Sequence, residues 1–138
     1  MEPNSLLEEI GGRSVLEKVH KIFYDKLYEH PWLKGYFDGI DQKKIEDQQT
    51  DFMMQLTGGP KIYAGKTPKS AHQHILITDE LFELRSSLLS ESIKEAGLPD
   101  ELRKEWLAAD ATFKRILVKK SAEECSTAYP GQPILNFQ

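Results

Sequence analysis

One histidine, His72, stands where this chain could hold a metal ion. It follows a glycine pair at 58–59 and a loop over 60–68, and it opens a short apolar segment. A neutral imidazole is a good ligand for iron, and its second ring nitrogen then needs an acceptor that orients it. His74 is two residues away and cannot share a helix face with His72. His72 is therefore either an ordinary histidine or the single side-chain ligand of a metal.

Two glutamines interrupt the apolar face of one expected helix. Ile45, Phe52 and Leu56 define the arc of that helix that we expect to be buried. Gln49 falls inside this arc, and Gln48 lies at its flank. Burial of an amide without a partner costs about 1–3 kcal/mol. Gln49 is therefore either satisfied within the fold, which its position alone favours, or left open for a ligand.

Two further polar residues lie on apolar helix faces. Tyr24 is at the edge of the arc of a helix over 14–29, so its ring can be buried while its hydroxyl seeks a partner. Its position alone favours a boundary tyrosine with the hydroxyl in water. Arg85 lies near the middle of the apolar arc of an expected helix over 78–96. It can snorkel, pair with an acid such as Asp110, or reach a bound anion, and we expect pairing because buried arginine is rarely unpaired.

Helical spacing of apolar residues runs along most of the chain, and no convincing alternating run predicts a strand. Asp41 is a good N-cap, and glycine pairs are good stops. Ser5 is a further candidate cap, and Thr78 or Asp79 begins a later helix. The expected helical segments are 5–10, 14–29, a turn within 31–37, 42–57, a short piece near 69–75, 78–96 and 100–120. The sequence therefore predicts an all-α domain over 1–122, followed by a C-terminal tail over 123–138 whose composition is rich in Ser, Thr, Pro, Gly and Gln.

Composition excludes several classes of function. The 138 residues carry a net charge of -4 with acids and bases interspersed, which argues against nucleic acid as a partner. No apolar run is long enough to span a bilayer and no signal peptide opens the chain, so we expect a soluble cytoplasmic protein. The single cysteine, Cys125, excludes an internal disulfide framework. No nucleophile elbow or phosphate-binding glycine loop is present.

Taken together, these residues resemble a truncated (two-over-two) globin, most like the first subgroup. The resemblance runs from Leu6 to about Val118 and rests on an ordered series of motifs rather than on any one of them. The motifs are Ile10-Gly11-Gly12, Phe23-Tyr24-Asp25-Lys26-Leu27, Tyr36-Phe37, Gln49 with Phe52, Leu56-Thr57-Gly58-Gly59-Pro60, Tyr63-Ala64-Gly65, Ala71-His72, Ile77-Thr78, Phe82 and Gly97-Leu98-Pro99. The resemblance implies a two-over-two helical sandwich around haem, with a vestigial first helix and a short proximal helix.

The resemblance also assigns roles to individual residues. It implies that His72 is the proximal iron ligand and that Phe37 packs flat on the porphyrin. Tyr24 and Gln49 would donate hydrogen bonds to a gas on the distal side. The remaining expected contacts are Gln48 on the distal side and Ile45, Phe52 and Phe82 against the cofactor. Lys44 matches a propionate position of the family, and Tyr63, Lys66 and Lys69 are looser candidates for the propionates.

The leading interpretation is a haem b protein that reversibly binds O₂, and other diatomic gases such as NO and CO, at a five-coordinate iron. Its rival is a nitric oxide dioxygenase that needs an external reductase, since no reductase domain is fused to the chain. A gas sensor and a haem-free helical interaction module remain as alternatives. Two departures stand out: Arg85 replaces the valine or tryptophan usual in the family, and the final helix has no histidine for covalent haem attachment. We expect a monomer or a weak homodimer.

Overall fold

Helices make up the regular structure of this protein. The computed structural model describes residues 6–58, 72–127, 129–132 and 134–136, and within them it has two isolated β-bridges and no strand. The helices are α1 (Leu6–Ile10), α2 (Arg13–Glu29), α3 (Gln42–Leu56), α5 (Asp79–Glu95), α6 (Asp100–Ala111) and α7 (Lys114–Leu117), with 3₁₀ helices at Lys34–Phe37 and Ala122–Glu124. The predicted all-α fold is confirmed. None of the helices in the described ranges is both long and apolar enough to cross a membrane.

Side-chain caps mark where helices α3 and α5 begin. The Asp41 carboxylate accepts the Lys44 backbone N–H at 2.9 Å, so α3 begins at Gln42. The Thr78 hydroxyl accepts the Leu81 backbone N–H at 3.3 Å, so α5 begins at Asp79. Both caps were predicted from the sequence. The proposed cap at Ser5 and the loop over 60–68 lie outside the described residues.

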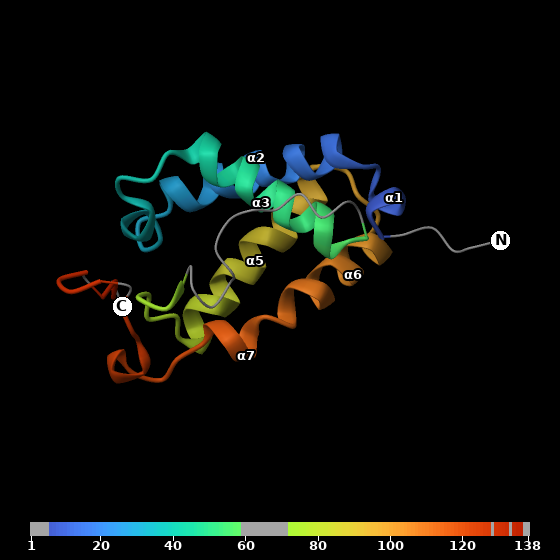
Figure 1. Ribbon diagram of the computed structural model, residues 1–138. Helices are drawn as coiled ribbons and strands as arrows, with labels where there is room; N and C mark the ends of the chain where they lie inside the picture. The colour runs from blue at the N-terminus through green and yellow to red at the C-terminus, as the bar shows by residue number, and fades with distance from the viewer. Residues whose placement is uncertain (1–5, 59–71, 128, 133, 137–138) are drawn as a thin grey trace.

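The long helices form two layers. Figure 1 shows α2 and α3 side by side in one layer, over a second layer that contains α5 and α6. Helix α2 packs on α5 as well as on α3, and it therefore lies at the centre of the fold. Leu16 and Val19 of α2, Ile93 of α5 and Trp106 of α6 are almost completely shielded from solvent. This shared core holds the two layers at a fixed separation.

The last long helix is shorter than predicted. We expected one helix over 100–120, whereas the chain leaves the helix after Ala111 and resumes it at α7. The Thr112 hydroxyl donates to the Ala109 carbonyl at 2.7 Å, and the Thr112 backbone N–H donates to the same carbonyl at 3.3 Å. A threonine that bonds back to its own helix competes with the next helical hydrogen bond. This local competition, which periodicity does not register, accounts for the break.

The buried face of α3 also differs from the prediction. Leu56 was expected in the core, yet 39% of its surface is exposed. The residues of α3 that are fully buried are Glu46, Thr50 and Met53, which lie one position further round the helix. Polar groups from α2 and α3 pair with each other at this face, so it can be buried although it is not apolar. The predicted arc placed α3 by its apolar residues alone and was wrong at Leu56.

Candidate functional site

A cavity of about 720 Å³ opens among α2, α3, α5 and the residues from 72 to 77. Eight of the residues predicted to form the site line it, namely Tyr24, Phe37, Ile45, Gln48, Gln49, Phe52, His72 and Phe82. They come from five separate parts of the chain. The fold therefore brings together most of the side chains that the sequence selected.

Tyr24 presents a hydroxyl to this cavity without a partner for it. The residue is buried, with 7% of its surface exposed, and its ring packs edge-on against Phe23 at 5.2 Å and Phe37 at 6.1 Å between centroids. Within the described part of the chain, no side chain or backbone group forms a hydrogen bond with the Tyr24 hydroxyl. Burial raises the pKa of Tyr24 above its ordinary value, although the Arg85 charge opposes this shift. The hydroxyl therefore keeps its proton at physiological pH and can donate a hydrogen bond.

The two glutamines of α3 face the same cavity. Gln49 is half-buried and Gln48 is exposed, and both line the cavity wall. Neither amide forms a hydrogen bond with another residue that the structure describes. An amide has two donors and one acceptor, so Gln49 can serve a polar ligand in the cavity with either end. Gln49 is therefore not satisfied by another described residue, and its amide is available to a ligand.

Arg85 pairs with Asp110, as we expected. Its Nη1 lies 2.6 Å from Asp110 Oδ2, and its Nη2 lies 2.9 Å from Asp110 Oδ1. The guanidinium also lies over the rings of Phe23 and Phe82, at 5.6 Å and 5.7 Å from their centroids. Burial disfavours the charged form of Arg85, but the Asp110 carboxylate outweighs this and keeps the Arg85 pKa above its ordinary value. The cavity wall thus contains a charged pair that is neutral as a unit.

The aromatic wall is built from rings that also support one another. The Phe37 ring stacks on Tyr28 at 5.0 Å, and the Tyr28 hydroxyl donates to the Ile40 carbonyl at 2.9 Å. Phe52 and Phe113 also line the cavity, and their rings pack against each other with 5.5 Å between centroids. These contacts fix flat apolar surfaces against which a planar ring system can lie.

His72 and His74 both line the cavity, although we predicted only His72 as a ligand. Both histidines are half-buried, and both have interactions within the protein. The Nζ atom of Lys119 donates to the His72 carbonyl at 3.0 Å, so the backbone of this histidine is held from the C-terminal side of the chain. The preference for His72 over His74 stays a prediction.

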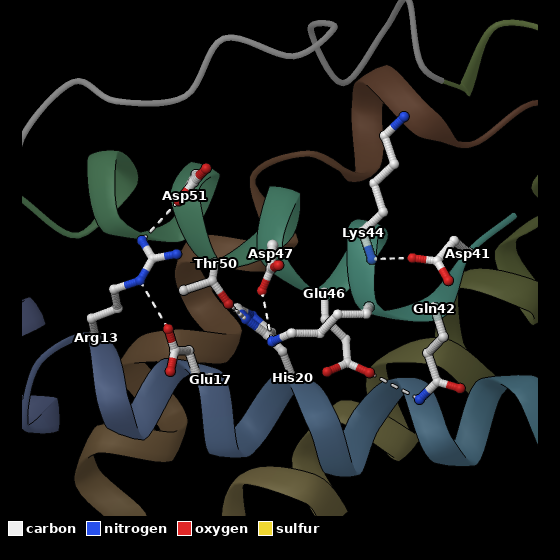
Figure 2. Close-up of polar contacts among 11 residues, drawn as sticks. Arg13, Glu17, His20, Asp41, Gln42, Lys44, Glu46, Asp47, Thr50 and Asp51 are labelled. Carbon is white, nitrogen blue, oxygen red and sulfur yellow. Dashed lines mark hydrogen bonds and ion pairs between the residues drawn. The ribbon is translucent and has the colours of Figure 1, made fainter.

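The predicted propionate contacts have mixed outcomes. Lys44 is exposed and does not line the cavity. Figure 2 shows its side chain pointing away from α2, while its backbone N–H meets Asp41. Tyr63, Lys66 and Lys69 lie outside the described residues. The geometry therefore leaves these four contacts as predictions.

Comparison with known proteins decides the family. A model of the bacterial-like globin family matches residues 5–118 of this chain. The chain belongs to this globin family. Among its relatives, the group 1 truncated hemoglobin GlbN of Mycolicibacterium paratuberculosis is 34% identical over 110 residues, which cover 80% of this chain and 81% of that protein. The group 1 truncated hemoglobin of Tetrahymena pyriformis is 30% identical and covers 72% of this chain and 82% of its own length.

Solved structures give the same result for the architecture. The truncated hemoglobin of Tetrahymena pyriformis in its Fe(III) form superposes with a TM-score of 0.79 at 26% identity, covering 85% of this globin and all of that chain. The group II truncated hemoglobin of Bacillus anthracis has the same TM-score of 0.79 at 23% identity, covering 87% and 95%, and it supports the fold alone. The predicted truncated, two-over-two globin fold is confirmed, and group 1 proteins prevail among the relatives.

Globin membership implies haem, and the cavity of this globin suits that cofactor. Its wall combines apolar rings, two histidines, and the hydroxyl of Tyr24 and the amide of Gln49, which have no hydrogen-bond partner among the described residues. Buried polar groups without partners are rare in proteins unless a ligand or water satisfies them. The donor set therefore fits a planar apolar cofactor with a small polar ligand beside it.

One buried polar pair was missed by the sequence reasoning. Figure 2 shows His20 of α2 directed at Thr50 of α3, and His20 Nδ1 lies 2.7 Å from Thr50 Oγ1. Both residues are about 1% exposed. The signal was present, because His20 lies between Leu16 and Phe23 at helical spacing on the apolar arc of α2.

Proposed function

We propose that this globin reversibly binds O₂ at the iron of haem b, which His72 would hold as the protein's axial ligand. Haem supplies an iron atom with one open position for a diatomic gas. The observation that carries the proposal is Tyr24, a buried tyrosine whose hydroxyl faces the cavity and has no partner in the described part of the chain. Such a group is stable only if a ligand or water takes its hydrogen bond.

The chain's own residues divide the work of binding between them. Phe37, Phe52 and Phe82 offer apolar surfaces to the porphyrin, and Ile45 limits water at the cavity wall. Tyr24 and Gln49 would donate hydrogen bonds to the polar end of the bound gas, with Gln48 further out on α3. Each such hydrogen bond stabilises the bound gas by about 1 kcal/mol, and this slows its release. Lys44, Tyr63 and Lys69 are the proposed contacts for the propionates.

Charge near the gas would be small. Arg85 lies in the wall but is neutralised by Asp110 through two hydrogen bonds. The gas would therefore meet hydrogen-bond donors rather than an unpaired cation. NO and CO fit the same space, and their binding belongs to the same proposal. We propose a five-coordinate or water-bound resting iron, with His72 as its one ligand from the protein.

The rate of O₂ release tests the distal hydrogen bonds. Tyr24→Phe and Gln49→Leu should each release O₂ at least about fivefold faster, because each removes a hydrogen bond worth about 1 kcal/mol. Tyr28→Phe is the matched control on α2, since its hydroxyl is already bonded to the Ile40 carbonyl. Gln55→Leu is the matched control on α3, since Gln55 is exposed and away from the cavity. Unchanged rates in both test variants would overturn the proposed network.

The choice of His72 is tested in the same preparations. The purified protein should show a Soret band that His72→Gly abolishes or shifts and that His74→Gly preserves. Both histidines line the cavity, so this pair separates a ligand from a neighbour. A Soret band lost only in His74→Gly would assign the iron to the other histidine. The nitric oxide dioxygenase alternative uses the same cavity, and it requires NO consumption to nitrate when O₂ and a reductase are supplied.

A further inference from the structure

Main-chain hydrogen bonds join the C-terminal segment to the residues that follow His72. The Leu76 N–H donates to the Leu135 carbonyl at 2.9 Å, and the Leu135 N–H donates to the His74 carbonyl at 2.8 Å. The Ser126 N–H donates to the Gln73 carbonyl at 2.8 Å. Figure 1 shows the C-terminal segment folded back beside this part of the chain. A stretch whose composition predicted a free tail is thus paired with the segment that carries His72.

Lys119 adds a second attachment by its side chain. Its Nζ atom donates to the carbonyl of His72 at 3.0 Å, to that of Ile75 at 2.8 Å and to that of Leu117 at 3.4 Å. An ammonium group has three N–H donors, so these three carbonyls take all of them. The Lys119 backbone N–H donates in addition to the Ile77 carbonyl at 2.7 Å. One residue therefore ties α7 to both ends of the 72–77 stretch.

The residues after His72 depend on such contacts because they lie outside the helices; a local backbone hydrogen bond runs from the Ile75 N–H to the His72 carbonyl at 2.9 Å. Residues 73–78 lie between helices, so their backbone groups need partners from elsewhere. Leu135 also packs against the hydrophobic core, whereas its neighbour Ile134 is 36% exposed. The apolar side chain of Leu135 thus anchors this C-terminal segment to the core of the domain.

The residues that make these attachments follow the family match. That match ends at residue 118, and Lys119, Ser126 and Leu135 come after it. The division into a domain over 1–122 and a tail over 123–138 stays a prediction. Ser126 and Leu135 form hydrogen bonds with the domain directly.

We propose that Lys119, Ser126 and Leu135 are positioning residues, which hold the backbone of His72 and of the residues directly after it and thereby fix the His72 imidazole relative to the iron. The proposal rests on the proposed function, in which His72 binds haem. Two hydrogen bonds from the Lys119 ammonium group restrict the carbonyls of His72 and Ile75. A ligand whose backbone is restricted in this way keeps one orientation and leaves the iron less readily.

Two variants of the full haem-loaded protein test the positioning role. Lys119→Met removes the three ammonium hydrogen bonds and keeps most of the side-chain volume, and Lys120→Met is its matched control at an exposed neighbour. A chain ending at Cys125 removes both hydrogen bonds of Leu135, and Ile134→Ser is its control. Lys119→Arg keeps a charged hydrogen-bond donor, so its behaviour should lie between that of Lys119→Met and that of the wild type. Circular dichroism checks that each variant is folded.

Three measurements report on the His72 segment. Amide hydrogen exchange at Leu76 should be at least about tenfold faster in the shortened chain, because its N–H loses its acceptor. Haem transfer to an excess of apomyoglobin should be about tenfold faster in Lys119→Met. The iron–histidine stretching band of the ferrous protein, measured by resonance Raman, should shift or broaden in both variants. Lys120→Met and Ile134→Ser should match the wild type in all three.

The outcomes separate the two proposals. A wild-type protein without an iron–histidine band would overturn the proposed role of His72 itself. A wild-type band that Lys119→Met and the shortened chain leave unchanged would overturn the positioning proposal alone, even if amide exchange became faster. A band that shifts equally in Lys120→Met would also overturn it, because the effect would not depend on the Lys119 contacts.

Discussion

Helices α2 and α3 each present polar groups to two different surroundings. At the interface between them, His20 meets Thr50 at 2.7 Å, and both are almost fully buried. At the cavity, Tyr24 lies one turn beyond His20 on α2, and Gln49 directly precedes Thr50 on α3, yet neither forms a hydrogen bond within the described chain. The polar groups of these two helices thus pair with each other at their interface, whereas those at the cavity are left without a partner among the described residues.

This difference distinguishes structural polar residues from those available to a ligand. Burial alone does not separate them, because Tyr24 and His20 are both buried. The presence of a partner inside the fold does separate them, since an unpaired buried group destabilises the protein unless something else binds it. Arg85 combines both conditions, because it lines the cavity but is paired with Asp110. We therefore expect the paired groups to control stability and the open groups to control binding.

The largest expected effect comes from breaking the Arg85–Asp110 pair. Asp110→Asn leaves the guanidinium charged without a counter-charge, which should lower the free energy of unfolding by about 3–5 kcal/mol. The side chain of Asp110 is only 8% exposed, so little solvent screens the charge that is left unpaired. Asp100→Asn on the same helix is the matched control, because Asp100 is 74% exposed and pairs with Arg103 at the surface.

Chemical denaturation measures both variants of the pair. A double variant, Arg85→Met with Asp110→Asn, should recover part of the stability because it removes the unpaired charge. If Asp110→Asn lowers the free energy of unfolding no more than Asp100→Asn does, then Asp110 does not compensate the charge of Arg85. The distinction between paired and unpaired polar groups would then not hold for Arg85.

The His20–Thr50 pair should make stability depend on pH. Burial, with a smaller contribution from the Arg85 charge, lowers the pKa of His20 to about 3. The unfolded chain binds a proton at His20 below about pH 6.5, whereas the folded chain resists it, so acid favours unfolding. Between pH 7 and pH 5 the loss should be about 2 kcal/mol. His20→Gln should flatten this slope in denaturation curves, and an equal slope in both proteins would show that His20 is not the responsible group.

Much of the fold could be predicted because the determining signals are local. The caps at Asp41 and Thr78 are single side chains next to the helices that they begin, and both form as predicted. The break after Ala111 was missed because a threonine hydroxyl competes with a backbone bond, and apolar spacing does not record that competition. Leu56 was misplaced because the face of α3 toward α2 is polar and paired rather than apolar.

The site was predicted in its residue types but not in its partners. Tyr24, Gln49 and His72 were selected as polar residues at unusual positions, and the fold does bring them to one cavity. Which polar residue pairs with which depends on contacts between distant segments, such as Lys119 with the His72 carbonyl. Periodicity gives the face of a residue and not its neighbour across the fold. The pairing of Leu135 with His74 and Leu76 was out of reach for the same reason.

The smallest effect gives the sharpest comparison, because it uses adjacent residues of α3. Thr50→Val keeps the shape of the side chain and leaves His20 Nδ1 without its partner, so the free energy of unfolding should fall by about 1–2 kcal/mol. The rate of O₂ release should not change, since Thr50 does not line the cavity. Gln49→Leu should do the opposite, with faster release and unchanged or slightly higher stability. Denaturation and stopped-flow release on the two variants measure both properties. If Thr50→Val speeds release as much as Gln49→Leu, then the interface and the cavity are coupled, and partner presence does not separate structure from binding in this globin.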